Sequence, residues 1–198
     1  TPPFDGPPLG PVALFPGWGR LKPFAIEASR HRFRGPDPLG SRRYARDLNH
    51  LKSIGSLDST TRTPDQTEIA RFWFEPLDTW NRIATTVLRQ GRVDAWRTAR
   101  ILALMSFAVA DADIVVFEAK YRFRFWRPYT AIRAGALDGN PSTAPDANWE
   151  PLRTTPPFPD YVSAHATGTG ATMELLKRTL GNKVSLTMDS ITAPLEMP

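Results

Sequence analysis

The sequence predicts an all-α protein that begins with an extended, proline-rich arm. Apolar residues recur at helical spacing in several segments, and no strand signal longer than a few residues occurs among them. The 20 prolines concentrate before residue 40 and within residues 135–160. We therefore expect an arm over residues 1–40 and a helical domain over residues 41–198. The aromatic residues of the arm are expected to pack into grooves of that domain: Phe4, Phe15, Trp18 and Phe24.

The first expected helix occupies residues 41–55. Ser41 is a good N-cap candidate, because a serine hydroxyl can accept a hydrogen bond from an amide of the first turn. Tyr44 and Leu48 follow at helical spacing and would share one apolar face. Gly55 is typical of the end of a helix.

Further helices are expected in the middle of the chain. Thr63 is a candidate N-cap, and Pro64 suits the first helical position because its missing amide would have no partner there. Two more helices are predicted over residues 77–90 and 93–119. The apolar run at residues 101–110 is shorter than the ~20 residues that a membrane span needs, so we expect a buried core helix there.

The last third of the sequence combines a long loop with one more helix. Residues 135–160 are rich in proline and aspartate, which is typical of a segment without regular structure. A helix is predicted from about Ser163 to Leu180, and Gly181 would end it.

Composition narrows the classes of function. Lys and Arg number 25 against 20 Asp and Glu, a net charge of +5 that supports an anionic ligand only weakly. The absence of cysteine excludes disulfides and thiolate metal sites. We predict no membrane span and no nucleic-acid binding. The sequence does not assign a compartment, and a soluble protein that is secreted or periplasmic stays open.

Cations and aromatic rings are dense in KYRFRFWRPYTAIR, residues 120–133. Lys120 and Arg127 are seven residues apart, close to two helical turns. Pro128 disfavours helical geometry at Arg127, so we expect one helix to end near Phe125 and another to begin at Pro128. Lys120 and Arg127 could then converge on one anion; the alternative is a set of solvated cations whose stems cover aromatic neighbours. The other arginines are expected to serve solubility or packing: Arg122, Arg124 and Arg133.

A second candidate segment is PFPDYVSAHATGTGA, residues 157–171. Ser163 is a strong N-cap candidate, and the amides of Ala164 and His165 would lie in the first turn of the helix. A helix N-terminus presents such amides and a partial positive charge to an anion. The His165 imidazole could exchange protons with a bound oxyanion. The alternative is a plain capped helix with a surface histidine.

Together these segments resemble a known superfamily. KYRFRFWRP matches Lys-x6-Arg-Pro, the first motif of the PAP2 superfamily, which joins acid phosphatases with vanadium-dependent haloperoxidases. VSAH is similar to its second motif, Pro-Ser-Gly-His. The flanking QTEIARFWF, WNRIA, DGNP and TPPFPDYVSAH look like the soluble bacterial, chloroperoxidase-related branch. The resemblance runs from about Gly17 to Gly181.

This resemblance implies a helical bundle of the haloperoxidase/PAP2 type whose pocket holds vanadate, or phosphate in the phosphatases. Lys120 and Arg127 would bind equatorial oxygens, and Ser163 and the amide of Ala164 would add hydrogen bonds. His165 would be the acid–base group. With vanadate and peroxide, such an enzyme would oxidise halide to a hypohalous-acid equivalent.

The match departs from the family pattern in two places. Ala164 stands where the second motif has glycine, and its methyl group could tighten or block the pocket. The third motif, Ser-Arg-x5-His-x3-Asp, would supply the vanadium ligand or the nucleophile. It is not found, and no histidine follows His165. No residue is therefore assigned as a metal ligand. We expect a C-terminally incomplete bundle from a longer protein; an associated cleaved fragment and a domain without catalysis are the alternatives.

Three hypotheses for function follow. The first is a vanadate-dependent haloperoxidase-like enzyme that oxidises halide with hydrogen peroxide at an oxyanion pocket. The second is an acid phosphatase that uses the same pocket. The third is a non-catalytic anion- or carbohydrate-binding protein. An exposed core face would favour self-association, which leaves a homodimer open.

Overall fold

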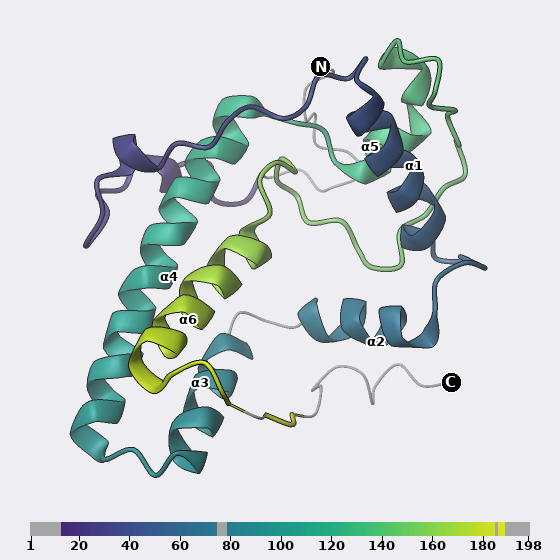
Figure 1. The fold of residues 1–198 in the computed structure, drawn as a ribbon. Coiled ribbons are helices and arrows are strands. Elements are labelled where there is room, and N and C mark those ends of the chain that lie inside the picture. The colour runs from purple at the N-terminus through teal and green to yellow at the C-terminus, as the bar shows by residue number, and fades with distance from the viewer. Residues whose placement is uncertain (1–12, 75–78, 185, 189–198) are drawn as a thin grey trace. The chain divides into compact units, whose positions relative to one another are not determined.

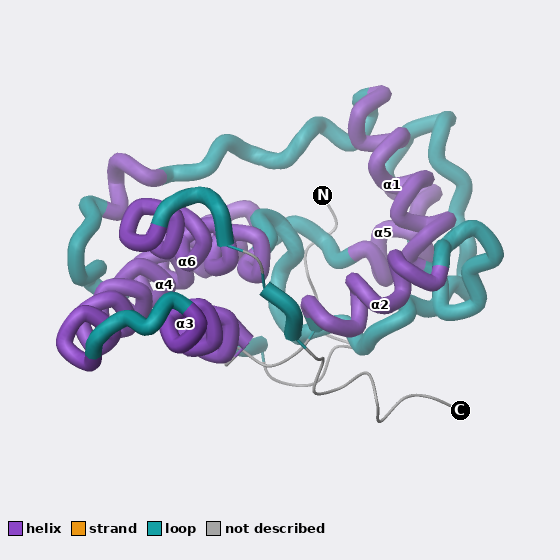
Figure 2. The backbone as a smooth tube through the Cα atoms, turned by 60° about the horizontal axis from the view of Figure 1, so that its bottom comes forward, coloured by secondary structure: helices purple, strands orange, loops and turns teal. Residues whose placement is uncertain are grey.

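The computed structural model describes residues 13–74, 79–184 and 186–188 of the chain (Figure 1). Throughout this part of the chain the regular structure is helical, and the tube in Figure 2 alternates only helices and loops. One isolated β-bridge pairs Ser56 with Pro151. The all-α class predicted from the sequence is confirmed. The prediction for Phe4 lies outside the described residues.

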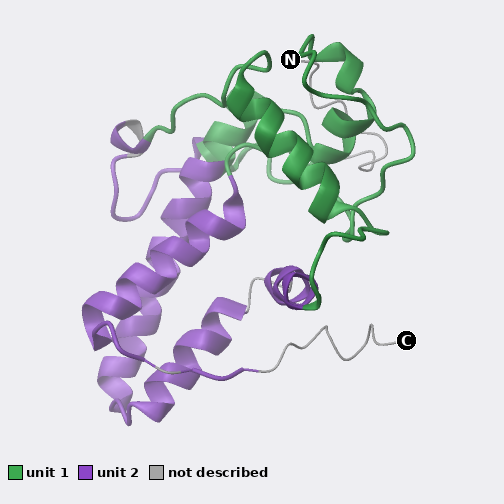
Figure 3. Ribbon diagram, turned by 45° about the vertical axis from the view of Figure 1, so that its right-hand side comes forward, with its two compact units in different colours: residues 1–19, 32–64, 117–162 green, residues 20–31, 65–116, 163–198 purple. Residues whose placement is uncertain are grey.

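The chain divides into two compact units, each described by itself (Figure 3). Unit 1 consists of Thr1–Gly19, Arg32–Pro64 and Phe117–Val162. Unit 2 consists of Arg20–His31, Asp65–Val116 and Ser163–Pro198. The long helix α4 (Ala95–Phe123) contributes most of its length to unit 2 and its last turns to unit 1.

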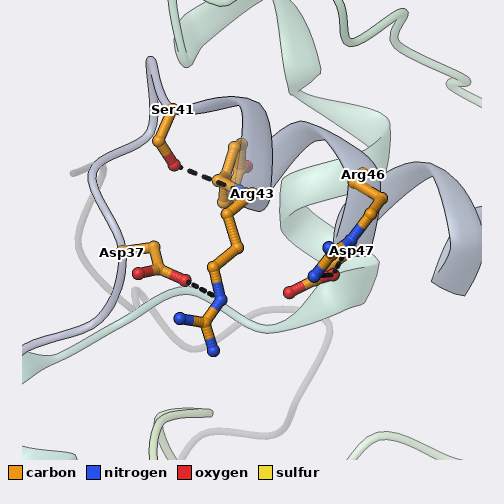
Figure 4. A network of polar contacts seen from close by, with 6 residues as sticks. Asp37, Ser41, Arg43, Arg46 and Asp47 are labelled. Carbon is orange, nitrogen blue, oxygen red and sulfur yellow. Dashed lines mark hydrogen bonds and ion pairs between the residues drawn. The ribbon is translucent and has the colours of Figure 1, made fainter.

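Unit 1 is built around α1 (Arg42–Gly55), α5 (Pro128–Arg133) and the short 3-10 helix η3 (Gly135–Leu137). The Ser41 hydroxyl accepts the Tyr44 amide at 3.1 Å and caps α1 as predicted (Figure 4). The buried apolar cluster of this unit joins the two helices: Tyr44, Leu48, Trp126, Ala131, Ile132 and Trp149.

The loop of residues 135–160 has no helix beyond η3, in agreement with the sequence prediction. It is nevertheless fixed to α1 by hydrogen bonds. The Trp149 indole donates to the Lys52 carbonyl at 2.9 Å, and the Leu152 amide donates to the Gly55 carbonyl at 2.9 Å. These bonds give the loop a defined path on unit 1.

Unit 2 contains α2 from its second residue onward (Pro64–Trp73), α3 (Thr79–Gln90), the first part of α4 and α6 (Ala164–Leu180). Helices α3, α4 and α6 run side by side in Figures 1 and 2. Their facing sides form one buried cluster: Ile83, Ala84, Leu88, Ile101, Met105 and Leu176. Gly181 ends α6 at φ 91°, a backbone angle that glycine adopts without strain, as predicted.

The apolar run at residues 101–110 is buried on one side only. Ile101 and Met105 are 2% exposed, whereas Leu104 and Phe107 are 40% and 44% exposed. The prediction of a buried core helix is therefore wrong for that second face, because the run is apolar all round and the described residues cover one side of it. No described helix is both long and apolar enough to cross a membrane.

The described part of the arm, residues 13–40, forms two 3-10 turns, η1 (Trp18–Arg20) and η2 (Ala28–His31). In unit 1, the Phe15 ring packs on Phe117 with centroids 5.0 Å apart. In unit 2, the Phe24 ring contacts Phe107 at 5.0 Å but is 67% exposed. The expected burial in grooves is thus wrong for Phe24, and for Trp18 at 37% exposure; their rings touch other rings while one side faces solvent.

Candidate functional site

Lys120 lies in the last turn of α4 and is 1% exposed. Its ammonium donates to the carbonyls of Pro159, at 2.9 Å, and of Asp160. Burial lowers the pKa of Lys120, the Asp160 carboxylate opposes that effect, and the Arg127 charge adds to it; together they bring the pKa to about 8. A lysine ammonium has three hydrogens, so two carbonyls leave one donor for a ligand.

Arg127 is the N-cap residue of α5, with an extended backbone at φ −76° and ψ 153°, and Pro128 follows at the first helical position. Its guanidinium pairs with the Asp160 carboxylate at 3.1 Å. The Arg127 Nε is buried and has no hydrogen-bond partner among the described residues. Burial lowers the pKa of Arg127, and the Asp160 charge opposes that effect.

Both cations lie over the ring of Phe158. The Lys120 Nζ is 4.9 Å and the Arg127 Cζ 5.5 Å from its centroid. The buried Phe117 ring packs edge-on against Phe158, with centroids 5.5 Å apart. Two cations opposed by one carboxylate leave an excess of positive charge beside a buried lysine, which favours an anion.

The path of the chain explains how the two cations meet. Helix α4 ends at Phe123, between the two ends predicted from the sequence, residue 119 and Phe125, and Arg124 adopts φ 47°. Residues 124–127 then turn the chain, and α5 begins at Pro128 as predicted. Lys120 from the helix end and Arg127 from the corner thereby face the same ring.

The other cations of this stretch have different surroundings. Arg122 pairs with Glu118 at 3.0 Å and lies over the Phe123 ring. Arg133 pairs with Glu150 at 3.1 Å. Arg124 is exposed. Among the described residues, Lys120 and Arg127 are the cations that lie over the Phe158 ring, so the stretch contributes two of its five cations to the candidate site.

Ser163, Ala164 and His165 form the N-terminus of α6 in unit 2. Ser163 is the N-cap, and its hydroxyl oxygen accepts the Ala166 amide at 3.2 Å. Because that bond uses only the oxygen, the O–H can still donate to an anion. The amides of Ala164 and His165 lie in the first turn, where an α-helix offers no carbonyl acceptor of its own.

The His165 side chain is exposed and lies beside an aromatic ring. Its centroid is 6.3 Å from that of Trp80 on α3, with the two planes at 61°. The Trp80 indole also donates to the Thr169 hydroxyl at 3.0 Å. The imidazole therefore packs beside Trp80 and is exposed.

The structure brings Lys120 and Arg127 together in unit 1, and Ser163, Ala164 and His165 together in unit 2. The described residues contain no group of three or more His, Asp or Glu side chains that could hold a metal ion. The sequence predictions missed three contributors. Phe158 and Asp160 lie in the quoted PFPDYVSAH segment, and their proximity to the motif was the available signal. Trp80 lies in WNRIA, which carries no local sign of its contact with α6.

Comparison with known proteins gives three matches. Residues 100–197 match the family described as the VCPO second helical-bundle domain. Vanadium chloroperoxidase of Curvularia inaequalis is 32% identical over 160 residues, which is 68% of this chain and 26% of that protein. The crystal structure of the first bacterial vanadium-dependent iodoperoxidase superposes with a TM-score of 0.74 at 25% identity, over 97% of this chain and 48% of that one.

The matches thus extend over most of this chain and over a smaller share of its relatives. The chain spans about a quarter of the fungal chloroperoxidase and about half of the bacterial iodoperoxidase. The helical-bundle description of the matched family agrees with the helices observed here.

Proposed function

This chain belongs, by sequence and by fold, to the vanadium-haloperoxidase type of protein, and from that premise we propose that it serves vanadate-dependent oxidation of halide by hydrogen peroxide. In this proposal Lys120 and Arg127 bind the oxygens of the oxyanion. Ser163 and the Ala164 amide add hydrogen bonds, and His165 transfers protons.

One observation carries the proposal: beside the buried ammonium of Lys120, the buried Arg127 Nε has no hydrogen-bond partner in the part of the chain that the structure describes. A buried polar nitrogen without an acceptor is costly, and so are two cations opposed by one carboxylate. A tetrahedral oxyanion bound by these two side chains would accept from that nitrogen and from the third Lys120 hydrogen. The donor set therefore fits the oxygen atoms of vanadate or of phosphate.

Vanadate, when bound, supplies the activation of peroxide toward halide. The residues of this chain have simpler tasks. Lys120 and Arg127 neutralise the anion and stabilise charge that develops on its oxygens. The Ser163 hydroxyl donates one hydrogen bond, and the His165 imidazole takes or returns a proton at an oxygen of the bound anion.

The phosphate alternative uses the same donors, because vanadate and phosphate are both tetrahedral and anionic. Turnover of p-nitrophenyl phosphate that vanadate inhibits would identify an acid phosphatase. Binding of either anion, without turnover of phosphoester or oxidation of halide, would identify the non-catalytic binding protein instead.

The test compares binding with catalysis. Vanadate affinity is measured by isothermal titration on this chain, and bromide oxidation is assayed in the full-length protein with and without vanadate. We expect Lys120→Met and Arg127→Met to weaken vanadate binding at least ~10-fold, the effect of one lost charge-assisted hydrogen bond of about 1.5–3 kcal/mol.

Arg124→Gln is the matched control, since it removes an exposed cation from the same segment and should leave affinity unchanged. Equal losses in all three variants would point to general electrostatics rather than a site. Wild-type protein that binds vanadate but oxidises no halide would overturn the haloperoxidase proposal.

A further inference from the structure

Trp80 is a buried side chain that contacts the first two turns of α6 within unit 2. It lies near the start of α3 and is 5% exposed. Its large ring occupies the space beside Gly168. A Cβ atom at Gly168 would lie 2.3 Å from the Trp80 Cη2, closer than real Cβ contacts. Gly168 therefore admits the indole where any larger residue would displace it.

The same indole makes two more contacts with α6. Its Nε1 donates to the Thr169 hydroxyl at 3.0 Å, and its ring packs at 61° to the His165 imidazole with centroids 6.3 Å apart. His165, Gly168 and Thr169 are spaced i, i+3 and i+4, so they share one face of the helix. One side chain thus contacts the histidine and the turn that follows it.

We propose that Trp80 is a positioning residue for the His165 imidazole. The hydrogen bond to Thr169 fixes the rotation of the indole, and the absence of a side chain at Gly168 lets the indole approach the helix. The T-shaped ring contact then limits the orientations of the imidazole. An imidazole held in this way meets its proton partner without first losing rotational freedom. The consequence for catalysis depends on the proposed function, whereas the positioning of the ring does not.

Nuclear magnetic resonance tests the contact directly, because the chain has only 3 histidines. In Trp80→Leu the aromatic ring is lost, and the His165 ring signals should shift while those of His31 and His50 stay in place. Thr169→Val removes only the acceptor, so it should broaden or shift His165 while the fold is kept. Trp80→Phe, which keeps a ring, should restore part of the wild-type shift.

The control is Ile83→Val, which disturbs a buried residue of the same helix that makes no ring contact with His165. It should leave all the histidine signals unchanged. If Trp80→Leu and Thr169→Val leave the His165 signals where they are, or if Ile83→Val moves them equally, Trp80 is a core residue alone and the proposal is wrong.

Kinetics of the full-length protein separate this proposal from the proposed function. We expect Thr169→Val and Trp80→Phe to lower kcat on the order of 10-fold to 100-fold with little change in KM, as misplacement of a catalytic group does. If the His165 signals shift in the Trp80 and Thr169 variants but the wild-type protein oxidises no halide, the haloperoxidase function is rejected and the positioning role is retained. A loss confined to KM would reject the positioning role.

Discussion

Lys120 holds its charge where only 1% of its surface reaches solvent. Water does little to stabilise the ammonium there, and the carbonyls of Pro159 and Asp160 replace only part of that hydration. Burial therefore lowers the pKa of Lys120 from 10.5 to about 8. A bound anion would raise this pKa again, because it stabilises the charged form.

This coupling predicts a pH-dependent affinity. Sulfate keeps a constant charge between pH 6 and 10, so any change of its affinity with pH comes from groups of the protein. Affinity should fall above about pH 8, by up to about tenfold per pH unit, as Lys120 loses its proton. Isothermal titration across this range measures it.

Lys120→Gln provides the control for the pH series, since it should bind sulfate weakly and with no fall above pH 8. Constant affinity of the wild-type protein up to pH 9.5 would mean that Lys120 is not an anion ligand. The Asp160 carboxylate raises the pKa of Lys120, so Asp160→Asn should move the fall to lower pH.

Among the elements, α1 shows how short-range chemistry defines a helix. The Ser41 hydroxyl accepts the Tyr44 amide at 3.1 Å, and Arg43 in the first turn pairs at 3.1 Å with Asp37, which precedes the helix (Figure 4). Both side chains of that ion pair are largely exposed, so the pair should contribute little. The Ser41 cap should contribute more to the free energy of unfolding than the ion pair, because it accepts from an amide that has no acceptor within the helix.

Ser41→Ala should therefore lower the free energy of unfolding by about 1 kcal/mol in a urea titration. Ser106→Ala is the comparison, since Ser106 is exposed within α4 and alanine is the better helix former. That variant should change the free energy by at most about 0.5 kcal/mol. A larger loss at Ser106 than at Ser41 would contradict the capping role.

Helix ends were predictable from sequence, and the burial of helix faces was not. Each of these signals acts within one helical turn, so it can be recognised from the sequence alone: Ser41, Pro64, Pro128 and Gly181. The exposed faces of Leu104 and Phe107 depend on which partners cover them. When apolar residues occur on all sides of a helix, the pattern does not predict which face will be buried against other elements.

At the scale of the whole molecule, the candidate site was predictable in part. The seven-residue spacing and Pro128 indicated that Lys120 and Arg127 could converge, with solvated cations as the alternative. Their contacts with Phe158 and Asp160 join residues more than 30 positions apart, and no spacing rule covers such pairs. A long loop without regular structure separates the two segments, so the sequence does not indicate which of its residues contact α4.

The proposed function predicts that binding of one anion slows hydrogen exchange in both units. If Lys120, Arg127 and Ser163 bind the same vanadate, ligand at 100 times its Kd should stabilise the folded chain by about 2.7 kcal/mol. Hydrogen exchange should slow at residues 117–127 and also at residues 163–169. Protection of only one segment would assign the anion to a single unit and reject the five-residue site.

The close fit of Gly168 under Trp80 ties two distant positions of the sequence together. A bulky side chain at 168 and an indole at 80 cannot occupy the same space, so substitutions at these two positions should not be independent. Natural variants that acquire alanine or serine at 168 should also have exchanged the tryptophan for a smaller residue. In the laboratory, Gly168→Ala should be tolerated far better together with Trp80→Phe than alone.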